Sequence, residues 1–302
     1  MMYISRYWTL YALLLLPLVY FVIFRYGPMQ YILVAFKKYR VVDTLWEMKW
    51  AGSYGMEHFV AAFSNRDFLF SIRNTIILNL LDRLLGFPAP VILAILLNEL
   101  AFKRFKRVTQ TIAYMPHFLS WVIVGGMAKQ ILATNDGSLN AFFRGLFNLK
   151  EGIPFLESPV YWVFSFVLIG IWQSVGWNTI IYLAAITGIS PELYEAAAVD
   201  GANRMRRIWH ITLPGLRPTI VTLLILSMGS ILGGDFERVY AFLSPLSRNV
   251  GTTIPVFVYE YGIRGYQYSL STAVGFFQSL IGMFFLFGTN AIAKKFGERG
   301  VW

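Results

Sequence analysis

The sequence predicts an all-α, polytopic membrane protein with six transmembrane helices. Hydrophobic residues make up 57% of the 302 residues and charged residues only 14%, whereas an ordinary soluble domain is about one-quarter charged. A transmembrane helix needs about 20 mainly apolar residues. Six stretches meet this need, at residues 8–33, 68–98, 107–133, 160–188, 219–243 and 270–293. We expect residues 1–302 to form a single transmembrane domain.

The first and fifth of these stretches need justification. The first could be mistaken for a signal peptide, but "FRYGPMQ" follows it in place of a small-residue cleavage site, so we expect a retained helix. Only seven residues precede it, which leaves open whether the natural chain begins earlier. The fifth is strongly apolar only over 219–234, and we extend it toward Leu243 to reach a spanning length.

Charge and cysteine content exclude several classes of protein. The formal net charge is +10, but the basic residues flank apolar stretches and do not form one basic domain, so we expect no nucleic-acid partner. The chain has no cysteine, which excludes disulfides, thiolate catalysis and cysteine metal sites.

The distribution of Lys and Arg predicts the orientation, because basic residues gather on the cytoplasmic side. The segments 1–7, 99–107, 189–218 and 294–302 are about twice as rich in Lys and Arg as the loops between them. The count for the two terminal segments includes Arg6 and Arg299. We therefore expect both termini in the cytoplasm.

Two charged residues, Asp82 and Arg83, fall inside the second predicted span. A charge at such a depth costs roughly 2.5–3.5 kcal/mol unless it is paired or hydrated. One interpretation is a structural pair, formed by the two residues with each other or with a neighbouring subunit. The other is a role in a substrate pathway.

The fourth predicted span carries a second polar group. Gln173 and Trp177 are four residues apart and share a helix face, which Trp172 and Asn178 flank. Aromatic rings beside amides are typical of sugar sites, since a ring packs on the apolar face of a pyranose and an amide binds its hydroxyls. Helix packing at a membrane interface is the alternative interpretation.

No catalytic constellation occurs in the sequence. The three histidines, His58, His117 and His210, are far apart and lie in no H-E-x-x-H pattern. No G-x-S-x-G nucleophile motif and no G-x-x-x-x-G-K-[ST] phosphate loop is present. We therefore predict no catalytic residue, no metal site and no cofactor held by this chain.

The polar segment 189–218, between the fourth and fifth spans, has a clear local logic. Ser190 and Pro191 suit a helix N-terminus, and "ELYEAAAVD" strongly favours a helix. Gly201 supplies a turn, and residues 202–212 predict a second, basic helix that we expect Pro214 and Pro218 to end. Such a hairpin could simply bind anionic lipid at the membrane surface.

The spacing within this segment is more specific. The pattern E-A-A-x3-G-x9-I-x-L-P is complete, and its fixed positions are Glu195, Ala196, Ala197, Gly201, Ile211, Leu213 and Pro214. It resembles the signature loop of the membrane subunits of bacterial ATP-binding-cassette (ABC) importers. With residues 86–99, 114–123 and 170–220, the chain resembles the polysaccharide-permease branch of the maltose-type (type I) importers, often called LplB-like, in which the alginate importer's membrane subunit is a close candidate.

This resemblance implies a fold and a set of partners. It implies the type I permease fold with a cytoplasmic coupling helix between spans four and five, which docks on an ATPase. There Glu195 accepts hydrogen bonds from the ATPase or braces the turn, and Gly201 permits the chain reversal. Two separate ATPase subunits bind ATP and Mg²⁺, a second permease completes the path, and a periplasmic or extracellular solute-binding protein delivers a saccharide such as alginate.

The resemblance also implies a cellular location, and one alternative function remains. The resemblance implies a multi-pass protein of the bacterial cytoplasmic (inner) membrane, in contact with membrane lipid. The outer segments 53–68 and 142–159 would meet the solute-binding protein or form plain interfacial helices. The alternative function is a stand-alone secondary transporter or channel, for which the sequence offers only Asp82 and Arg83 as an ion-coupling group.

Overall fold

The computed structural model describes residues 7–297 and 300–301, and over these residues the protein is helical. Its one extended pairing in that range is an isolated bridge between Lys37 and Trp50. Arg6 and Arg299, which entered the orientation argument, lie outside the described residues. The expected all-α class is thus confirmed.

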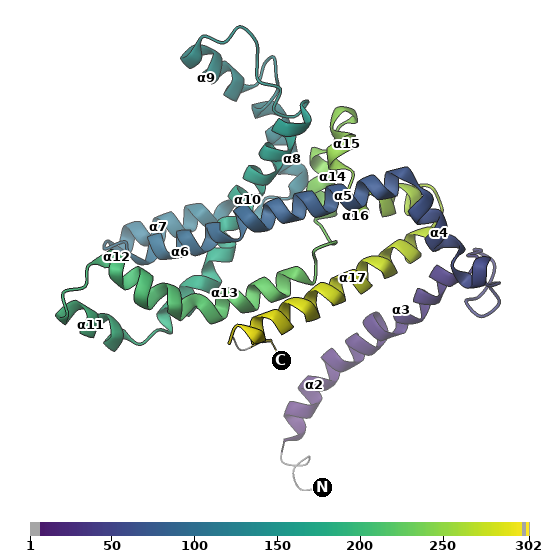
Figure 1. Cartoon of the computed structure of the whole chain (residues 1–302), viewed down its shortest axis with the longest axis horizontal. Coiled ribbons are helices and arrows are strands. Elements are labelled where there is room, and N and C mark those ends of the chain that lie inside the picture. Colours follow the sequence, from purple (N-terminus) through teal and green to yellow (C-terminus); the bar gives the residue numbers. More distant parts are fainter. Residues whose placement is uncertain (1–6, 298–299, 302) are drawn as a thin grey trace. The chain divides into compact units, whose positions relative to one another are not determined.

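Two compact units divide the chain. Unit 1 comprises Met1–Phe68 and Val258–Ser279, and unit 2 comprises Leu69–Phe257 and Leu280–Trp302. Two helices, α5 and α17, run through the boundary between the units. Each unit is described by itself below (Figure 1).

Unit 1 is built from the N-terminal helices and the segment before α17. Its elements are α2 (Trp8–Phe21), η1 (Val22–Tyr26), α3 (Gly27–Met29), η2 (Gln30–Phe36), η3 (Ser53–Gly55), α4 (Glu57–Ser64), η8 (Val258–Arg264) and the first part of α17 (Tyr268–Lys295). No residue of α2 is buried. An all-round apolar and exposed helix of this kind suits contact with lipid or with another membrane subunit.

Unit 2 holds most of the remaining helices. They are α5 (Arg66–Leu81), η4 (Asp82–Gly86), α6 (Pro88–Asn98), α7 (Lys103–Tyr114), η5 (Met115–Phe118), α8 (Trp121–Ile131), α9 (Ser138–Phe147), α10 (Pro159–Thr187), α11 (Pro191–Val199), α12 (Arg204–Arg207), η6 (Ile208–Thr212), α13 (Leu213–Met228), α14 (Phe236–Phe242), η7 (Pro245–Ser247), α15 (Arg248–Gly251) and α16 (Ile254–Phe257). The central helix is α10, which contacts α6, α7 and α13.

The helices long and apolar enough to cross a membrane match the expected spans in number. Within the described residues there are five, and six if one bent pair is counted as a span. They are Trp8–Phe36, Arg66–Asn98, Pro159–Thr187, Arg204–Met228, Tyr268–Lys295 and the pair Lys103–Phe118 with Trp121–Ile131.

The expected span over 107–133 is not one straight helix, because it is broken into two helices that meet at 99°. Pro116 lacks an amide hydrogen and lies in the short η5. Leu119 then turns extended, at φ −81° and ψ 131°, and Ser120 caps α8 by accepting a hydrogen bond from the Ile123 amide at 3.4 Å. The chain thus ends one helix and begins another.

The fifth span differs from the expectation at both ends. It starts at Arg204 and stops at Met228, so Pro214 and Pro218 do not end the helix and the extension toward Leu243 is wrong. The π-helical η6 opens the hydrogen-bond ladder directly before Pro214, where the missing donor costs least. After Met228 a glycine-containing turn intervenes, and Asp235 caps the separate helix α14.

Polar residues of α5 bind backbone carbonyls of the segment between α13 and α16. Asn79 donates to the carbonyls of Ile231 at 2.9 Å and Gly233 at 2.6 Å. Asn74 donates to Asn249 and Thr252, each at 3.0 Å. A single helix thus satisfies carbonyls that follow α13 and others in and directly after α15.

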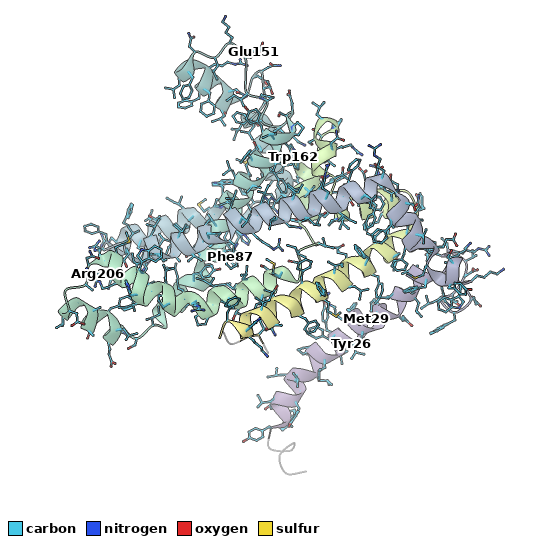
Figure 2. All side chains as sticks on the ribbon, viewed as in Figure 1. Tyr26, Met29, Phe87, Glu151, Trp162 and Arg206 are labelled. Atoms are coloured by element: carbon cyan, nitrogen blue, oxygen red, sulfur yellow. The ribbon has the colours of Figure 1, made fainter. Side chains whose placement is uncertain are left out.

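An aromatic cluster forms the best-buried part of unit 2. Trp162, labelled in Figure 2, stacks on Phe166 with ring centroids 5.1 Å apart and donates from Nε1 to the Phe242 carbonyl at 3.1 Å. Phe166 meets Phe242 edge to face at 6.0 Å. This cluster joins α10 to α14 and so fixes the position of the residues on α14.

Gly176 of α10 tests how tightly these helices pack. A Cβ at this position would overlap the Ala113 carbonyl of α7, whereas a Cβ at Gly126 of α8 would meet nothing within 4 Å. We expect Gly176→Ala to lower the free energy of unfolding by about 1–3 kcal/mol relative to Gly126→Ala. Thermal unfolding in detergent measures this, and equal stability of the two variants would contradict close packing of α10 on α7.

Candidate functional site

A cavity of about 310 Å³ lies inside unit 2, and helices from distant parts of the sequence line it. Its polar lining comes from Asp82 and Arg83 of η4, Ser174 and Asn178 of α10, and Arg238 of α14. Apolar side chains, including Phe87 (labelled in Figure 2), complete the wall. The structure therefore brings three of the predicted pathway residues together: Asp82, Arg83 and Asn178.

The central interaction at the cavity is an ion pair between Asp82 and Arg238. Arg238 donates from Nη1 to Oδ2 at 2.7 Å and from Nη2 to Oδ1 at 3.1 Å. The side chains are 26% exposed for Asp82 and 11% for Arg238. A bidentate, shielded pair of this geometry is stronger than a surface ion pair and is sensitive to loss of either partner.

The surroundings hold the Arg238 guanidinium in one place. Its Nη2 also donates to the Phe166 carbonyl at 2.6 Å, and its Cζ lies 3.9 Å from the centroid of the Phe166 ring. Gly170 is required here, because a Cβ at this position would overlap the guanidinium. Trp121 faces the same group at 5.4 Å. The cation is therefore enclosed by aromatic rings and one helix backbone.

Arg83 does not pair with Asp82 and instead binds the end of α13. Its Nη2 donates to the Ser227 carbonyl at 2.6 Å, and its Nη1 donates to the Asn79 carbonyl at 3.0 Å. Consecutive residues on a helix do not face each other, which explains why the sequence neighbours have separate partners.

Arg238 is the functional residue that sequence reasoning missed. It lies in the weakly apolar extension of the fifth expected span toward Leu243, for which the sequence predicts no site residue, and it is only 9% exposed. A signal for it did exist, because a carboxylate at Asp82 needs a cation that its helix neighbour cannot supply. "DFERVYAF" has a helix-capping Asp followed by an Arg among aromatic residues.

The predicted aromatic and amide residues of α10 have other contacts. Gln173 is buried and donates to the His117 carbonyl at 3.3 Å, and Trp177 stacks on the His117 ring at 4.6 Å with a 7° interplanar angle. They share a face, as expected, and they hold the broken third span at η5. Trp172 lines a different, apolar pocket against α8. Contact between cargo and these three residues stays a prediction.

The charges define what the cavity can do. Two guanidinium groups face one carboxylate, so the lining carries an excess of positive charge, and Ser174 and Asn178 add hydrogen-bonding groups. Such a lining suits a hydroxyl-rich or anionic solute. In the described part of the chain no group of three or more His, Cys, Asp and Glu residues could hold a metal ion.

The segment 189–218 forms the second candidate site. Helix α11 runs from Pro191 to Val199, and Gly201 turns the chain with a φ of +72°, which favours glycine. Asn203 caps α12 by accepting a hydrogen bond from the Arg206 amide at 2.9 Å. Tyr194 bonds Thr212 at 3.0 Å and fixes α11 against η6. Figure 2 shows Arg206 at this end of unit 2.

The predicted motif residues divide into an exposed helix and a helical link. Glu195 and Ala196 are exposed on α11, and the exposed Leu193 and Val199 lie on the same short helix. Ile211 lies in η6 and Leu213 and Pro214 start α13, so these three belong to one continuous helical run that leads into the fifth span. Ala197 is half-buried. Helix α11 precedes this run and is joined to it by the Gly201 turn and the Tyr194–Thr212 hydrogen bond.

These features agree with what the family comparison finds. Residues 86–298 match the family described as binding-protein-dependent transport system inner membrane component. The chain belongs to this family and is the membrane-spanning permease subunit of an ABC importer. The motif-based prediction is confirmed, and the stand-alone transporter is not favoured.

Individual relatives place the chain within the family. It is 44% identical to Protein LplB of Bacillus subtilis, with 97% of this chain and 91% of that protein covered. It is 41% identical to the polygalacturonan/rhamnogalacturonan transport system permease protein YteP of the same bacterium, with 97% and 90% covered. A chain in the crystal structure of a bacterial alginate ABC transporter, in complex with an alginate pentasaccharide-bound periplasmic protein, has a TM-score of 0.87 and 36% identity, with 99% and 98% covered.

The Asp82–Arg238 pair makes a strong prediction about stability. Asp82→Asn or Arg238→Gln leaves one buried charge without its partner, and each should cost about 3–5 kcal/mol. The double variant should recover part of that cost, because no charge remains unpaired. Denaturant unfolding of the purified chain measures all three.

An exposed ion pair supplies the control for this prediction. Arg40 and Asp43 approach to 3.8 Å with a largely exposed arginine, so Arg40→Gln should cost less than about 1 kcal/mol. Strictly additive costs in the Asp82/Arg238 double variant would show that the two residues are not coupled.

Proposed function

We propose that the chain forms half of the pathway of an importer for an acidic oligo- or polysaccharide. A solute-binding protein delivers the saccharide, a second permease completes the pathway, and separate ATPase subunits drive transport. The observation that carries the choice of cargo is the cavity in unit 2, where two arginines face one aspartate beside the amide of Asn178. A uronic acid unit offers the complementary chemistry, with one carboxylate and several hydroxyls.

The relatives support an acidic cargo. One structural relative is described as a transporter for the acidic polysaccharide alginate, and it is 35% identical to this chain with a TM-score of 0.86. The relative at 41% identity is named for polygalacturonan and rhamnogalacturonan. An arabinooligosaccharide permease of Bacillus subtilis is 31% identical over 71% of this chain. The name of Protein LplB, at 44% identity, states no cargo, whereas two further relatives above 31% identity are named for polygalacturonan and rhamnogalacturonan and for alginate.

The coupling proposal rests on the exposed helix α11. Small and apolar side chains on a short exposed helix permit close docking in a groove of another protein, and Ala196, Leu193 and Val199 are all exposed. The ATPase would bind ATP and Mg²⁺, and closure of its dimer would move α11. Since the run from Arg204 to Met228 is continuous, that movement would tilt the fifth span and reopen the cavity to the other side of the membrane.

Orientation and remaining contacts complete the proposal. The loop 189–218 and both termini lie in the cytoplasm, as the distribution of Lys and Arg indicates. The chain itself performs no catalysis. Trp172, Gln173 and Trp177 border the path indirectly, and the segments 53–68 and 142–159 meet the solute-binding protein.

Asn178 permits a direct test of cargo charge. Asn178→Asp adds a carboxylate to the cavity. This carboxylate would repel the carboxylate of a bound acidic sugar and weaken its binding by more than about 1 kcal/mol. We expect uptake of labelled tetragalacturonate by the reconstituted importer to show a KM raised about tenfold or more. Asn178→Leu is the matched control for size without charge. An equal KM in the two variants would refute recognition of an acidic sugar here.

Glu195 permits a test of coupling. Glu195→Ala removes the carboxylate proposed to bind the ATPase, so saccharide-stimulated ATP hydrolysis should fall about tenfold or more, the cost of losing one charge-assisted hydrogen bond. Glu192→Ala is the matched control, because Glu192 is also exposed on α11. Full stimulation in the Glu195 variant, with the importer assembled, would refute this role.

A further inference from the structure

A second cavity, of about 290 Å³, lies entirely within unit 1. Its polar and aromatic lining consists of Lys38, Tyr39, His58, Tyr266, Gln267 and Tyr268, and we call it the tyrosine pocket. We infer that the tyrosine pocket is a separate binding site for one sugar unit of the imported saccharide. The identity of the ligand rests on the proposed function, whereas the existence of the site rests on the pocket itself.

Three tyrosine rings give the pocket aromatic walls. Tyr39 and Tyr268 meet edge to face with centroids 5.0 Å apart, and Tyr266 meets Tyr268 at 6.4 Å. Tyr266 is 77% exposed, so its ring is available to a ligand. A sugar ring presents an apolar C–H face to such rings while the phenol groups remain free to bond its hydroxyls.

The polar lining is held in position before any ligand binds. The Lys37 carbonyl accepts hydrogen bonds from Ser269 Oγ at 2.8 Å and from His58 Nε2 at 3.2 Å, and the Ser269 hydroxyl in turn accepts the Tyr39 amide at 3.0 Å. Because a carbonyl only accepts, His58 Nε2 is the donor in this bond. The pocket thus offers both donors and acceptors at fixed places.

The backbone at Tyr266 is strained. Its φ is +56°, a value that side chains other than glycine rarely adopt, and the next residue donates its amide to the Tyr261 carbonyl at 3.1 Å. This turn places Tyr266 directly before the helix that starts at Tyr268, with its ring exposed. Strained residues of this kind gather at functional sites, and here the strain places an aromatic ring at a cavity.

Charge and size favour a sugar over other ligands. Lys38 pairs with Glu57 at 3.1 Å, so the ammonium group is already balanced and the pocket should accept neutral and acidic sugars alike. The Gly52 amide and Lys38 lower the pKa of Glu57, so this balance holds at neutral pH. A cavity of this size suits a small ligand, whereas a protein partner typically needs about 800 Å² of surface on each side.

Radical footprinting of the full chain in lipid nanodiscs tests the site. Tetragalacturonate and the neutral maltotetraose serve as probes, and mass spectrometry measures tyrosine oxidation with each. We expect both probes to slow oxidation of Tyr266 about threefold or more, in keeping with an aromatic contact. Oxidation of Tyr54 should not change, because Tyr54 lies in unit 1 but outside the pocket.

A matched pair of variants separates binding from folding. Tyr54 and Tyr266 both have a positive φ and both are strongly exposed, so their alanine variants make similar backbone changes. Tyr266→Ala should abolish the protection of Tyr268, whereas Tyr54→Ala should preserve it. Tyr266→Phe retains the ring and should preserve it as well.

Two results would overturn the inference. One is unchanged oxidation of Tyr266 and Tyr268 with either probe. The other is protection of these tyrosines by the sugar-free solute-binding protein, with no protection by either sugar alone. That result would make the pocket a protein-docking surface. If the importer takes up tetragalacturonate but neither probe slows oxidation of the pocket tyrosines, only this second site is refuted and the proposed function stands. Absence of uptake, with the pocket protected by maltotetraose, refutes only the proposed acidic cargo.

Discussion

The constraint on which unit 2 depends is that backbone groups freed by a helix break must find partners inside the protein, because lipid offers none. The fifth span ends at Met228, and the chain then turns repeatedly before α16. Asn74 and Asn79 of α5 supply hydrogen bonds to that stretch, and Arg83 of η4 supplies one to the end of α13. Trp162 supplies another, to the end of α14. The non-helical backbone is therefore stable beside a cavity, and in membrane proteins such backbone occurs where it is buried in protein or lines a cavity.

The same arrangement gives the cavity its charge. Helix α14 can carry a buried arginine because Asp82 neutralises it through two hydrogen bonds and the Phe166 carbonyl accepts a third. Gly170 leaves the space that the guanidinium fills. Arg83 is fixed by backbone carbonyls, which satisfy its hydrogen bonds without cancelling its charge. Positive charge is therefore retained at the cavity after the ion pair is formed, and this residual charge connects the packing of unit 2 to the choice of an acidic cargo.

Much of this could be predicted from the sequence, and the limits have physical causes. Apolar length predicts the spans, and motif spacing predicts the loop with Glu195 and Gly201, because both signals are local. The partner of Asp82 is not local: Arg238 lies 156 positions away, on a short separate helix that sequence reasoning joined to the fifth span. The 99° bend needs Leu119 and Ser120 to leave helical geometry together, which Pro116 alone does not dictate. Pro214 does not end the helix, because the preceding π-helical turn accommodates a residue without an amide hydrogen, and the sequence does not reveal that turn.

The most direct test of the central claim is a gentle-detergent purification of the tagged chain from its native membrane, with mass spectrometry of what remains bound. The proposed function requires an ATPase and a second permease as stable partners of this chain. The account predicts that both are recovered and that the second permease carries its own E-A-A loop. Recovery of the chain alone, under conditions that keep a control importer intact, would contradict the account and leave α11 without a docking partner.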